Sequence, residues 1–338
     1  MTPSDQQNPP PPMADLVGPM VKAAAINAAG ELGLFQVLAD GPRSIPELAS
    51  ATGASENGVG LLVEALAAVG YLERTDGVYA NGATARAWLT PASRVDFTPL
   101  LLWAPVTWHL LEDLGRVVRD GGPKPTLYEY LRDRPDLGRI LSRYMRALAQ
   151  LAAEPVAQAV AVPETARRLL DFGGSHGLFN MAFCRRHPEL EAVVFDLSTS
   201  VAETGETIAA EGLSDRVTVQ HGDYLADEIG RNYDIVLCSS LLHNHTRDDS
   251  RRLLAKAADA PNPGGLIVVH EFLRSEPPDA FNALYSLLFF LYSGTRNYSF
   301  EEIAGWLQEA GFGGLGRADL PPDGQSSIVT AVKTSQEG

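Results

Sequence analysis

Cysteine, basic residues and long apolar runs are all scarce in this sequence. Of its 338 residues only 2 are cysteines, Cys184 and Cys238, and both lie in apolar stretches, so we expect buried, reduced thiols rather than a disulfide or a metal-binding pair. The longest apolar run, "ALYSLLFFLYSG", is too short and too polar to span a membrane. The N-terminal stretch "MTPSDQQNPPPP" lacks the apolar core of a secretion signal. We therefore expect a cytoplasmic protein with no membrane partner.

Positive charge is outnumbered throughout the chain. Lysine and arginine total 27 against 42 acidic residues, which gives a formal net charge of −15. Such a chain is repelled by phosphate backbones, and its basic residues form only short pairs, as in "CRRH" and "DDSRRLL". We therefore expect no nucleic-acid partner. The length suggests two domains with a substantial core.

The N-terminal part of the chain has the pattern of a winged helix. A proline-rich tail over residues 1–12, expected to be disordered, precedes the order helix, helix, helix, hairpin over residues 13–95. "SIPELASATGAS" has the Ser44 and Glu47 pattern of a capping box, and "YLERTDGVYANG" has Asp76-Gly77 at a hairpin turn.

Winged helices often bind DNA, but this one lacks the residues for it. The segment that would read the bases, residues 56–71, contains no lysine or arginine. The long apolar helix before it has few places to be buried in so small a domain. We therefore predict a dimerisation domain in a homodimer. The alternative, a DNA-binding regulator, would show salt-dependent retention on DNA.

Residues 96–163 are expected to form helices that link two domains. They carry Trp103, Trp108, Tyr144 and Met145 at helical spacing. Aromatic and methionine stripes are usually core, but helices that bridge two domains often wall a cleft between them. These four residues are therefore candidates for an acceptor pocket as well as for the core.

From residue 164 to residue 338 strands and helices alternate. The strands are "RRLLDFGG", "EAVVFDL", "RVTVQHGDYL", "YDIVLCSSLLH", "LIVVHEF", "GLGRADL" and "SSIVTAVK". This alternation predicts an α/β fold, a Rossmann-like, doubly wound, mostly parallel seven-stranded sheet. Its ligand should lie outside the carboxyl ends of the strands.

A glycine turn follows the first of these strands. In "LLDFGGSHGLFN" an apolar run ends at Asp171, passes Gly173, Gly174 and Gly177, and opens into a helix. Glycines let the backbone approach a ligand closely. The next strand, "AVVFDLS", ends at Asp196, about where a ribose-binding acid is expected. The two features together predict a nucleoside-bearing cofactor.

The remaining strand ends also carry polar residues. They are Gly222-Asp223-Tyr224, His243-Asn244-His245 and His270-Glu271. Tyr224 could stack on a base, whereas Asp223 alone could equally be a helix N-cap. A histidine at the carboxyl end of a strand favours a functional role over a structural one.

These motifs resemble a known family. "LLDFGGSHG", "VVFDL", "HGDYL", "LLHNH", "NPGGLIVVHE" and "EAGF", in this order, are similar to those of class I S-adenosylmethionine-dependent methyltransferases, and within them to the small-molecule O-methyltransferases of the caffeate and hydroxyindole type. The resemblance runs from about residue 13 to the end. It includes "AAGELGLFQVLADGPRSIPELA", which matches that group's winged-helix dimerisation domain.

The resemblance implies roles for individual residues. The cofactor site would consist of Asp171, Gly173, Gly174 and Gly177 around the methionyl group, Asp196 and Leu197 at the ribose, Gly222, Asp223 and Tyr224 at the adenine, and Ser239 where the family often has lysine. The general base would be His243, positioned by Glu271, with Asn244 next to it. The acceptor site would include Phe281, Tyr285, Phe289 and Asn297, together with the four candidates on the linking helices.

The chain departs from the family pattern around His243. Asn244, His245 and Arg247 replace an aspartate, a tryptophan and an acid, Asn297 falls near a second acid that braces the base, and Ser175 replaces a third loop glycine. If the segment is extended, His243 and His245 would point to one side and could bind a metal, with Thr295 near the third position of related C-methyltransferases. Otherwise His245 replaces the tryptophan in packing.

The sequence is therefore consistent with two reactions that use the same cofactor. The first is O-methylation of a small, secondary-metabolite acceptor with S-adenosylmethionine, giving S-adenosylhomocysteine, without a metal and with His243 as base, since histidine titrates near neutral pH. The alternative is C- or N-methylation, with a metal at His243 and His245.

Overall fold

A computed structural model describes residues 13–321 and 325–334. The tail expected at residues 1–12 lies outside the described residues. The chain divides into two compact units, Met1–Trp108 and His109–Gly338. Among the described residues, no helix combines the length and the apolar character that a membrane span requires.

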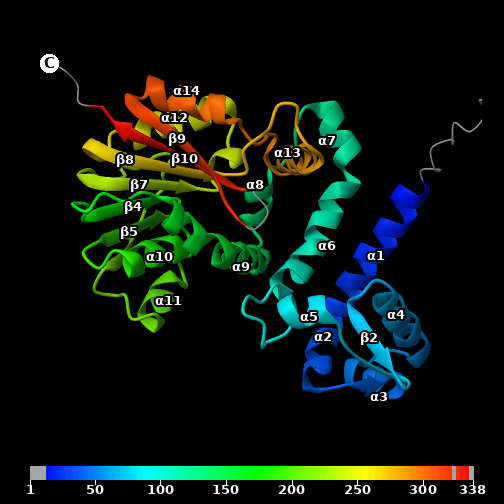
Figure 1. The fold of residues 1–338 in the computed structure, drawn as a ribbon. Helices are drawn as coiled ribbons and strands as arrows, with labels where there is room; N and C mark the ends of the chain where they lie inside the picture. The colour runs from blue at the N-terminus through cyan, green and yellow to red at the C-terminus, as the bar shows by residue number, and fades with distance from the viewer. Residues whose placement is uncertain (1–12, 322–324, 335–338) are drawn as a thin grey trace, which may run out of the picture. The chain divides into compact units, whose positions relative to one another are not determined.

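The first unit consists of short helices and a small antiparallel sheet (Figure 1). Its helices are α1 (Met13–Glu31), α2 (Leu34–Val37), η1 (Leu38–Asp40), α3 (Ile45–Thr52), α4 (Glu56–Ala68) and α5 (Ala83–Trp88), and α6 (Thr98–Glu112) begins in it. The sheet has the order β1 (Arg43–Ser44), β3 (Val78–Asn81), β2 (Leu72–Thr75). The predicted hairpin is present, with Asp76 and Gly77 at positive φ of 48° and 83°. The predicted capping box is also confirmed, because the Ser44 amide donates to Glu47 Oε2 over 2.7 Å.

The surface of α1 is unusually apolar. Leu16, Val17, Met20 and Val21 are each more than half exposed, at 59%, 53%, 52% and 59%. They repeat at helical spacing, so they form one stripe along the helix. We call these four residues the α1 stripe.

The second unit contains the predicted sheet. Its order is β6 (Val217–His221), β5 (Glu191–Asp196), β4 (Arg168–Phe172), β7 (Tyr233–Ser239), β8 (Pro261–Glu271), β10 (Ser327–Lys333), β9 (Phe312–Asp319). The first five strands are parallel, and β10 pairs antiparallel with both of its neighbours. The expected mostly parallel, seven-stranded, doubly wound sheet is therefore confirmed (Figure 1).

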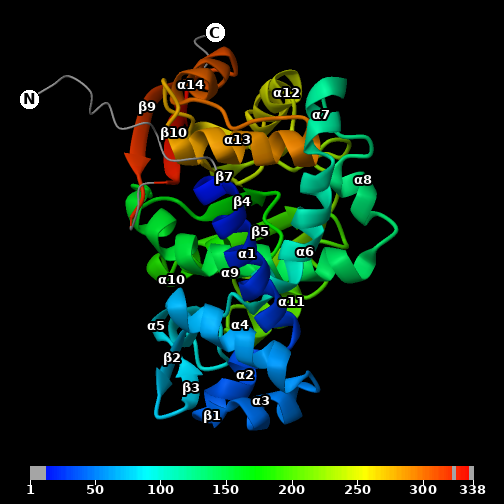
Figure 2. The ribbon, with the colours of Figure 1, turned by 90° about the vertical axis from the view of Figure 1, so that its right-hand side faces the viewer.

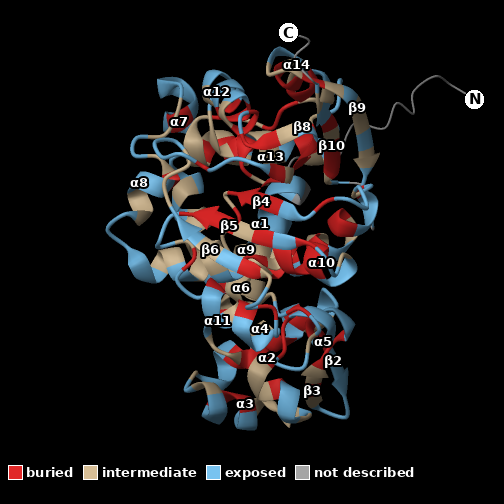
Figure 3. Ribbon diagram, turned by 90° about the vertical axis from the view of Figure 1, so that its left-hand side faces the viewer, coloured by how far each residue is buried: buried red, intermediate tan, exposed pale blue. Residues whose placement is uncertain are grey.

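Helices cover both faces of this sheet. The helices of the unit are α7 (Leu114–Asp120), α8 (Leu127–Leu131), α9 (Pro135–Ala159), α10 (Leu178–Arg186), α11 (Thr204–Ala210), α12 (Arg247–Ala257), α13 (Ala280–Ser293) and α14 (Phe300–Glu309). One core joins residues of α9 and α10 to one face, and a second core joins α12 and α14 to the other. Figure 3 shows the inner strands β4 and β5 coloured mostly as buried.

The side chains of β8 alternate between the two faces of the sheet, and this alternation decides which face each residue at the strand end lies on. Val268 belongs to the core under α10, and Val269 belongs to the opposite core. Successive side chains of a strand point to opposite faces. His270 therefore faces α10, where its ring lies 5.5 Å from that of Phe179, whereas Glu271 faces the other way.

Candidate active site

The glycine loop connects β4 to α10 as expected. Gly173 and Gly177 have φ of 81° and 68°, values that only glycine adopts easily. A Cβ on Gly174 would lie 2.6 Å from the Asp171 carboxyl carbon. The loop therefore needs its glycines both for the turn and for the close approach of the backbone to Asp171. Ser175, where the family has a third glycine, also adopts a positive φ, of 40°.

Asp171 is a buried carboxyl group that has no partner among the described residues. It is fully buried, and neither of its oxygens accepts a hydrogen bond from any described residue. Burial, and then the nearby Asp196, raise the pKa of Asp171 well above its ordinary value. The negative charge of a buried, unpaired carboxylate is stabilised by a ligand that brings a cationic hydrogen-bond donor. The ammonium of a methionyl group is such a donor, so the residue fits the expected cofactor.

Asn180 is a second buried polar group at the same loop, and the sequence analysis missed it. It lies in the first turn of α10, it is fully buried, and both ends of its amide lack a partner among the described residues. The signal was present, because an amide stands inside the otherwise apolar "LFNMAF".

Asp196 closes the loop from β5. Its carboxylate accepts hydrogen bonds from the amides of Ser175, at 3.0 Å, and Leu197, at 2.7 Å. Burial raises the pKa of Asp196, although these hydrogen bonds act against the shift. The Leu197 side chain is exposed. The strand end therefore presents a fixed carboxylate of the kind that binds a ribose diol.

The next strand end is packed against β5. A Cβ on Gly222 would lie 2.4 Å from the Phe195 ring, so this position requires glycine. Asp223 accepts a hydrogen bond from the Leu225 amide over 2.8 Å. The Tyr224 ring lies 5.4 Å from that of Phe172, and burial raises the pKa of the Tyr224 phenol.

Ser239 and His270 form a separate polar pair on the α10 face. The Ser239 hydroxyl lies 2.8 Å from His270 Nδ1. His270 is buried, its Nε2 has no partner among the described residues, and burial lowers its pKa to about 4. His270 is therefore a neutral histidine at physiological pH.

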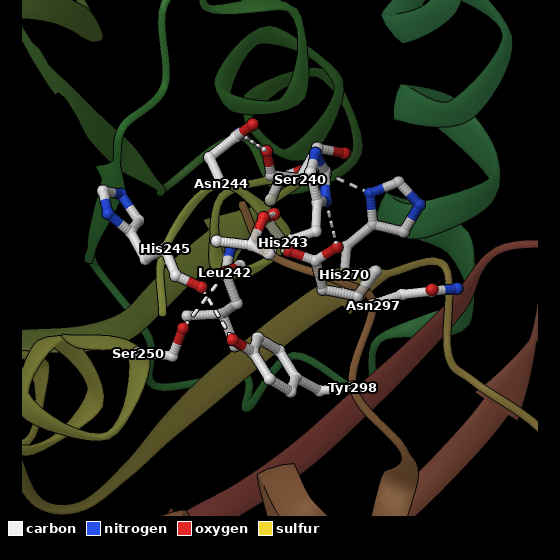
Figure 4. Close-up of polar contacts among 12 residues, drawn as sticks. Ser240, Leu242, His243, Asn244, His245, Ser250, His270, Asn297 and Tyr298 are labelled. Atoms are coloured by element: carbon white, nitrogen blue, oxygen red, sulfur yellow. Dashed lines mark hydrogen bonds and ion pairs between the residues drawn. The ribbon is translucent and has the colours of Figure 1, made fainter. Parts of the chain in front are cut away.

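His243 and Glu271 meet on the opposite face of the sheet. Figure 4 shows His243 and the labelled residues around it. His243 Nδ1 lies 2.6 Å from Glu271 Oε2, and the Leu242 amide donates to Glu271 Oε1 over 2.7 Å. Burial alone would raise the pKa of Glu271, but the His243 ring and these two hydrogen bonds lower it below its ordinary value. Both side chains are buried. The pair is therefore a histidine whose Nδ1 faces an ionised carboxylate.

The segment around His243 is not extended, so the condition under which His243 and His245 would point to one side is not met. Leu242–Asn244 forms the 3₁₀ turn η2, which begins directly after the β7 strand end. The Asn244 amide donates to the Ser240 carbonyl over 3.4 Å, whereas His245 Nε2 lies 3.1 Å from the Tyr224 hydroxyl. His243 and His245 therefore have different partners, on β8 and after β6. Within residues 13–321 and 325–334, no three His, Cys, Asp or Glu side chains are grouped as metal ligands.

Two polar residues near this turn, Asn297 and Thr295, come from the segment that follows α13. Asn297 is buried, donates to Asn282 over 3.0 Å and accepts from the Ser286 hydroxyl, so its amide is bound to α13. Thr295 donates its hydroxyl to the His243 carbonyl over 2.5 Å. Thr295 thus holds the backbone of the turn and has no free hydroxyl proton for another acceptor.

Next to His243 lies a row of aromatic rings from α13. Phe281, Tyr285 and Phe289 are spaced by four residues and share one helix face, with ring centroids 4.1 Å apart for the first pair and 6.1 Å for the second. The Phe289 ring is stacked on the His243 ring at 4.1 Å and 19°. Phe272 adds a fourth ring, 5.7 Å from Tyr285. We call Phe272, Phe281, Tyr285 and Phe289 the aromatic wall; Figure 2 shows α13, which carries three of them, lying across the unit in front of the sheet.

The other candidates for the acceptor site lie on two earlier helices. Tyr144 and Met145 are half-buried on α9, and burial, followed by Tyr285 and Tyr292, raises the pKa of the Tyr144 phenol. Tyr144 is therefore close to the aromatic wall. Trp103 is buried and Trp108 half-buried, both on α6 in the first unit, and their contact with an acceptor remains a prediction.

Known proteins share both units of this chain. The O-methyltransferase domain family matches residues 113–313, and the O-methyltransferase dimerisation domain family matches residues 14–91. The 3-hydroxy-5-methyl-1-naphthoate 3-O-methyltransferase of Streptomyces sahachiroi is 31% identical over 95% of this chain and 94% of its own length. The L-tyrosine C(3)-methyltransferase of Streptomyces lavendulae is 28% identical over 91% and 88%.

A solved structure agrees on the fold. Human N-acetylserotonin methyltransferase, solved in complex with S-adenosylmethionine, superposes with a TM-score of 0.87 over 99% of this chain and 100% of its own, at 21% identity. Together with the family matches, this confirms the resemblance found in the sequence. The chain belongs to the O-methyltransferase family of S-adenosylmethionine-dependent enzymes, and its N-terminal segment is that family's dimerisation domain.

Proposed function

We propose that this enzyme methylates a hydroxyl group of a small aromatic metabolite, with His243 as the general base. The observation that carries the proposal is the buried pair of His243 and Glu271, 2.6 Å apart, beside the aromatic wall. With Nδ1–H donated to an ionised Glu271, the lone pair of His243 is on Nε2, where it can take the acceptor's proton. Glu271 then stabilises the imidazolium that forms.

The cofactor site is proposed to use the carboxylates of three strand ends. S-adenosylmethionine supplies a methyl group that its positively charged sulfur already activates. Asp171 would bind the methionyl ammonium, Asp196 the ribose hydroxyls, and Asp223 with Tyr224 the adenine. Ser239 stands at the position of a family lysine, so this part of the site contributes a hydroxyl and not a charge. The reaction then depends mainly on the alignment of the acceptor with the methyl group.

The aromatic wall supports a flat, aromatic acceptor. Four rings next to the base offer stacking surface, and buried aromatic residues favour such contacts. The relative from Streptomyces sahachiroi acts on a hydroxynaphthoate, which is a molecule of this kind.

The enzyme is proposed to work as a cytoplasmic homodimer that binds neither DNA nor membranes. The α1 stripe supports the dimer, since four large apolar side chains in a row are exposed on the dimerisation domain. The excess of acidic residues supports the absence of nucleic acid.

Methylation at carbon or nitrogen is the second candidate, because one relative is an L-tyrosine C(3)-methyltransferase and another an N,N-dimethyltransferase. A metal-assisted version would place the ion at His243 and His245. Elemental analysis of the purified protein and a chelator test decide this version: bound metal at one equivalent and loss of turnover with chelator would support it, and their absence would exclude it.

The base is tested with a panel of hydroxyaromatic acceptors and an assay for released S-adenosylhomocysteine. His243→Ala should lower turnover by about 100-fold or more while leaving the affinity for S-adenosylhomocysteine unchanged. His187→Ala, at the far end of α10 from the glycine loop, is the matched control and should retain both. Unchanged turnover of His243→Ala would remove His243 from the mechanism.

A further inference from the structure

Three contacts hold His243 in place, and its pair with Glu271 is only one of them. Glu271 holds the ring in its plane, through Nδ1. Phe289 covers one ring face, with centroids 4.1 Å apart and planes 19° from parallel. Thr295 holds the backbone carbonyl of the same residue. Two of these three supports come from α13 and the turn that follows it.

The position expected for a second bracing acid gives no support to the imidazole. Asn297 is neutral, and its amide is bound to Asn282 and Ser286 on α13. No described residue other than Glu271 therefore forms an ion pair with His243. The ring face, in contrast, is closed by Phe289, which is itself buried.

We propose that Phe289 is a positioning residue for the base: its stacked ring fixes the plane of the His243 imidazole and stabilises the imidazolium, in the place of a second carboxylate. This inference rests on the proposed function of His243.

The physical reasons are orientation and charge. A single hydrogen bond at Nδ1 leaves the imidazole free to tilt about that bond, whereas a ring stacked on its face does not. A cation over an aromatic face is also attracted by the ring quadrupole, and this attraction is stronger where water is excluded. Both effects act on the protonated ring that forms in the transition state, so they affect turnover rather than binding.

The test compares variants of Phe289 in the full-length enzyme. Phe289→Leu keeps an apolar side chain but removes the aromatic face, Phe289→Met does the same with a side chain that adapts to gaps, and Phe289→Tyr keeps the face. Leu284→Ala, at an exposed position on the same helix, is the matched control. Binding of S-adenosylhomocysteine, measured by calorimetry, reports whether the cofactor site is intact.

Two readouts decide the proposal. The Leu and Met variants should lower kcat by about 2- to 30-fold with unchanged KM for S-adenosylmethionine, while the Tyr variant and the control keep most of the activity. In ¹³C-histidine NMR of the S-adenosylhomocysteine complex, the His243 signal should lose its upfield ring-current shift in the Leu and Met variants and keep it in Phe289→Tyr.

The failures can be told apart. If His243→Ala loses turnover but both the Leu and the Met variants keep wild-type kcat, Phe289 does not position the base, and the proposal is wrong. An unchanged His243 signal in both variants also overturns it. If His243→Ala keeps turnover, the proposed function fails instead, and the NMR comparison still reports whether the stack exists.

Discussion

His270 makes a quantitative prediction about acid stability. The side chain is 3% exposed, and burial lowers its pKa to about 4, whereas an unfolded histidine titrates near pH 6.5. Above pH 6.5 both states are neutral, and His270 does not change the pH dependence of unfolding. Below pH 6.5 the unfolded chain takes up a proton that the folded protein does not, so the free energy of unfolding falls as the pH falls.

The magnitude follows from the two pKa values. Each pH unit between about 6.5 and 4 lowers the free energy of unfolding by about 1.4 kcal/mol, which is about 2 kcal/mol at pH 5 and about 3 kcal/mol in total. His270→Asn places an amide near the position of Nδ1, so Ser239 keeps a partner, at a cost of about 1–2 kcal/mol at pH 7 for the smaller side chain. The variant and the wild type should therefore become about equally stable between about pH 5.8 and about pH 5.

Urea unfolding at pH 7, 6 and 5, at one protein concentration, measures this difference. The remaining titratable groups are common to both proteins, so the change in the difference with pH isolates His270. Leu284→Ala, which changes an exposed side chain that does not titrate, is the control and should give a constant difference. A constant difference for His270→Asn as well would refute the reasoning, because it would mean that the folded protein protonates His270 as readily as the unfolded chain does.

Three further predictions concern the active site and the dimer. Glu271→Gln should lower kcat by about a thousandfold without weakening S-adenosylhomocysteine binding. The reason is that opposite charges about 4 Å apart, at an effective dielectric constant of about 20, attract by about 4 kcal/mol. A kcat within tenfold of the wild type would contradict the role of Glu271. Gly222→Ala should weaken S-adenosylhomocysteine binding in calorimetry, because its Cβ would lie 2.4 Å from the Phe195 ring and the strand end must move; unchanged affinity would show that this strand end does not shape the cofactor site. The double variant Leu16→Asp, Met20→Asp should sediment as a monomer in analytical ultracentrifugation, and a persistent dimer would place the interface away from the α1 stripe.

The sheet and the glycine loop could be predicted from the sequence because their signals are local. Each strand of "LLDF" and "AVVFD" is a short apolar run, and the glycines stand in the turn that needs them. The hairpin at Asp76-Gly77 and the capping box at Ser44 are local in the same way and are present in the structure.

The arrangement around His243 could not be predicted because it is not local. Its partners Glu271 and Phe289 come from β8 and α13, and only the packing of these elements brings the rings to 4.1 Å. The pattern His-x-His suggested two rings on one side, but this holds only in an extended segment, and the chain turns there instead. Whether a polar residue such as Asn180 has a partner likewise depends on all its neighbours.

The alternation of β8 has a consequence for how this family can diversify. His270 and Glu271 are neighbours in the chain, yet one turns toward the glycine loop and α10 and the other toward the base and the aromatic wall. Mutations on the second side can therefore reshape the proposed acceptor site while the first side stays as it is. A strand that separates two tasks in this way allows one fold to keep its methyl donor and exchange its acceptors, in line with relatives of which one is a naphthoate 3-O-methyltransferase and another an L-tyrosine C(3)-methyltransferase.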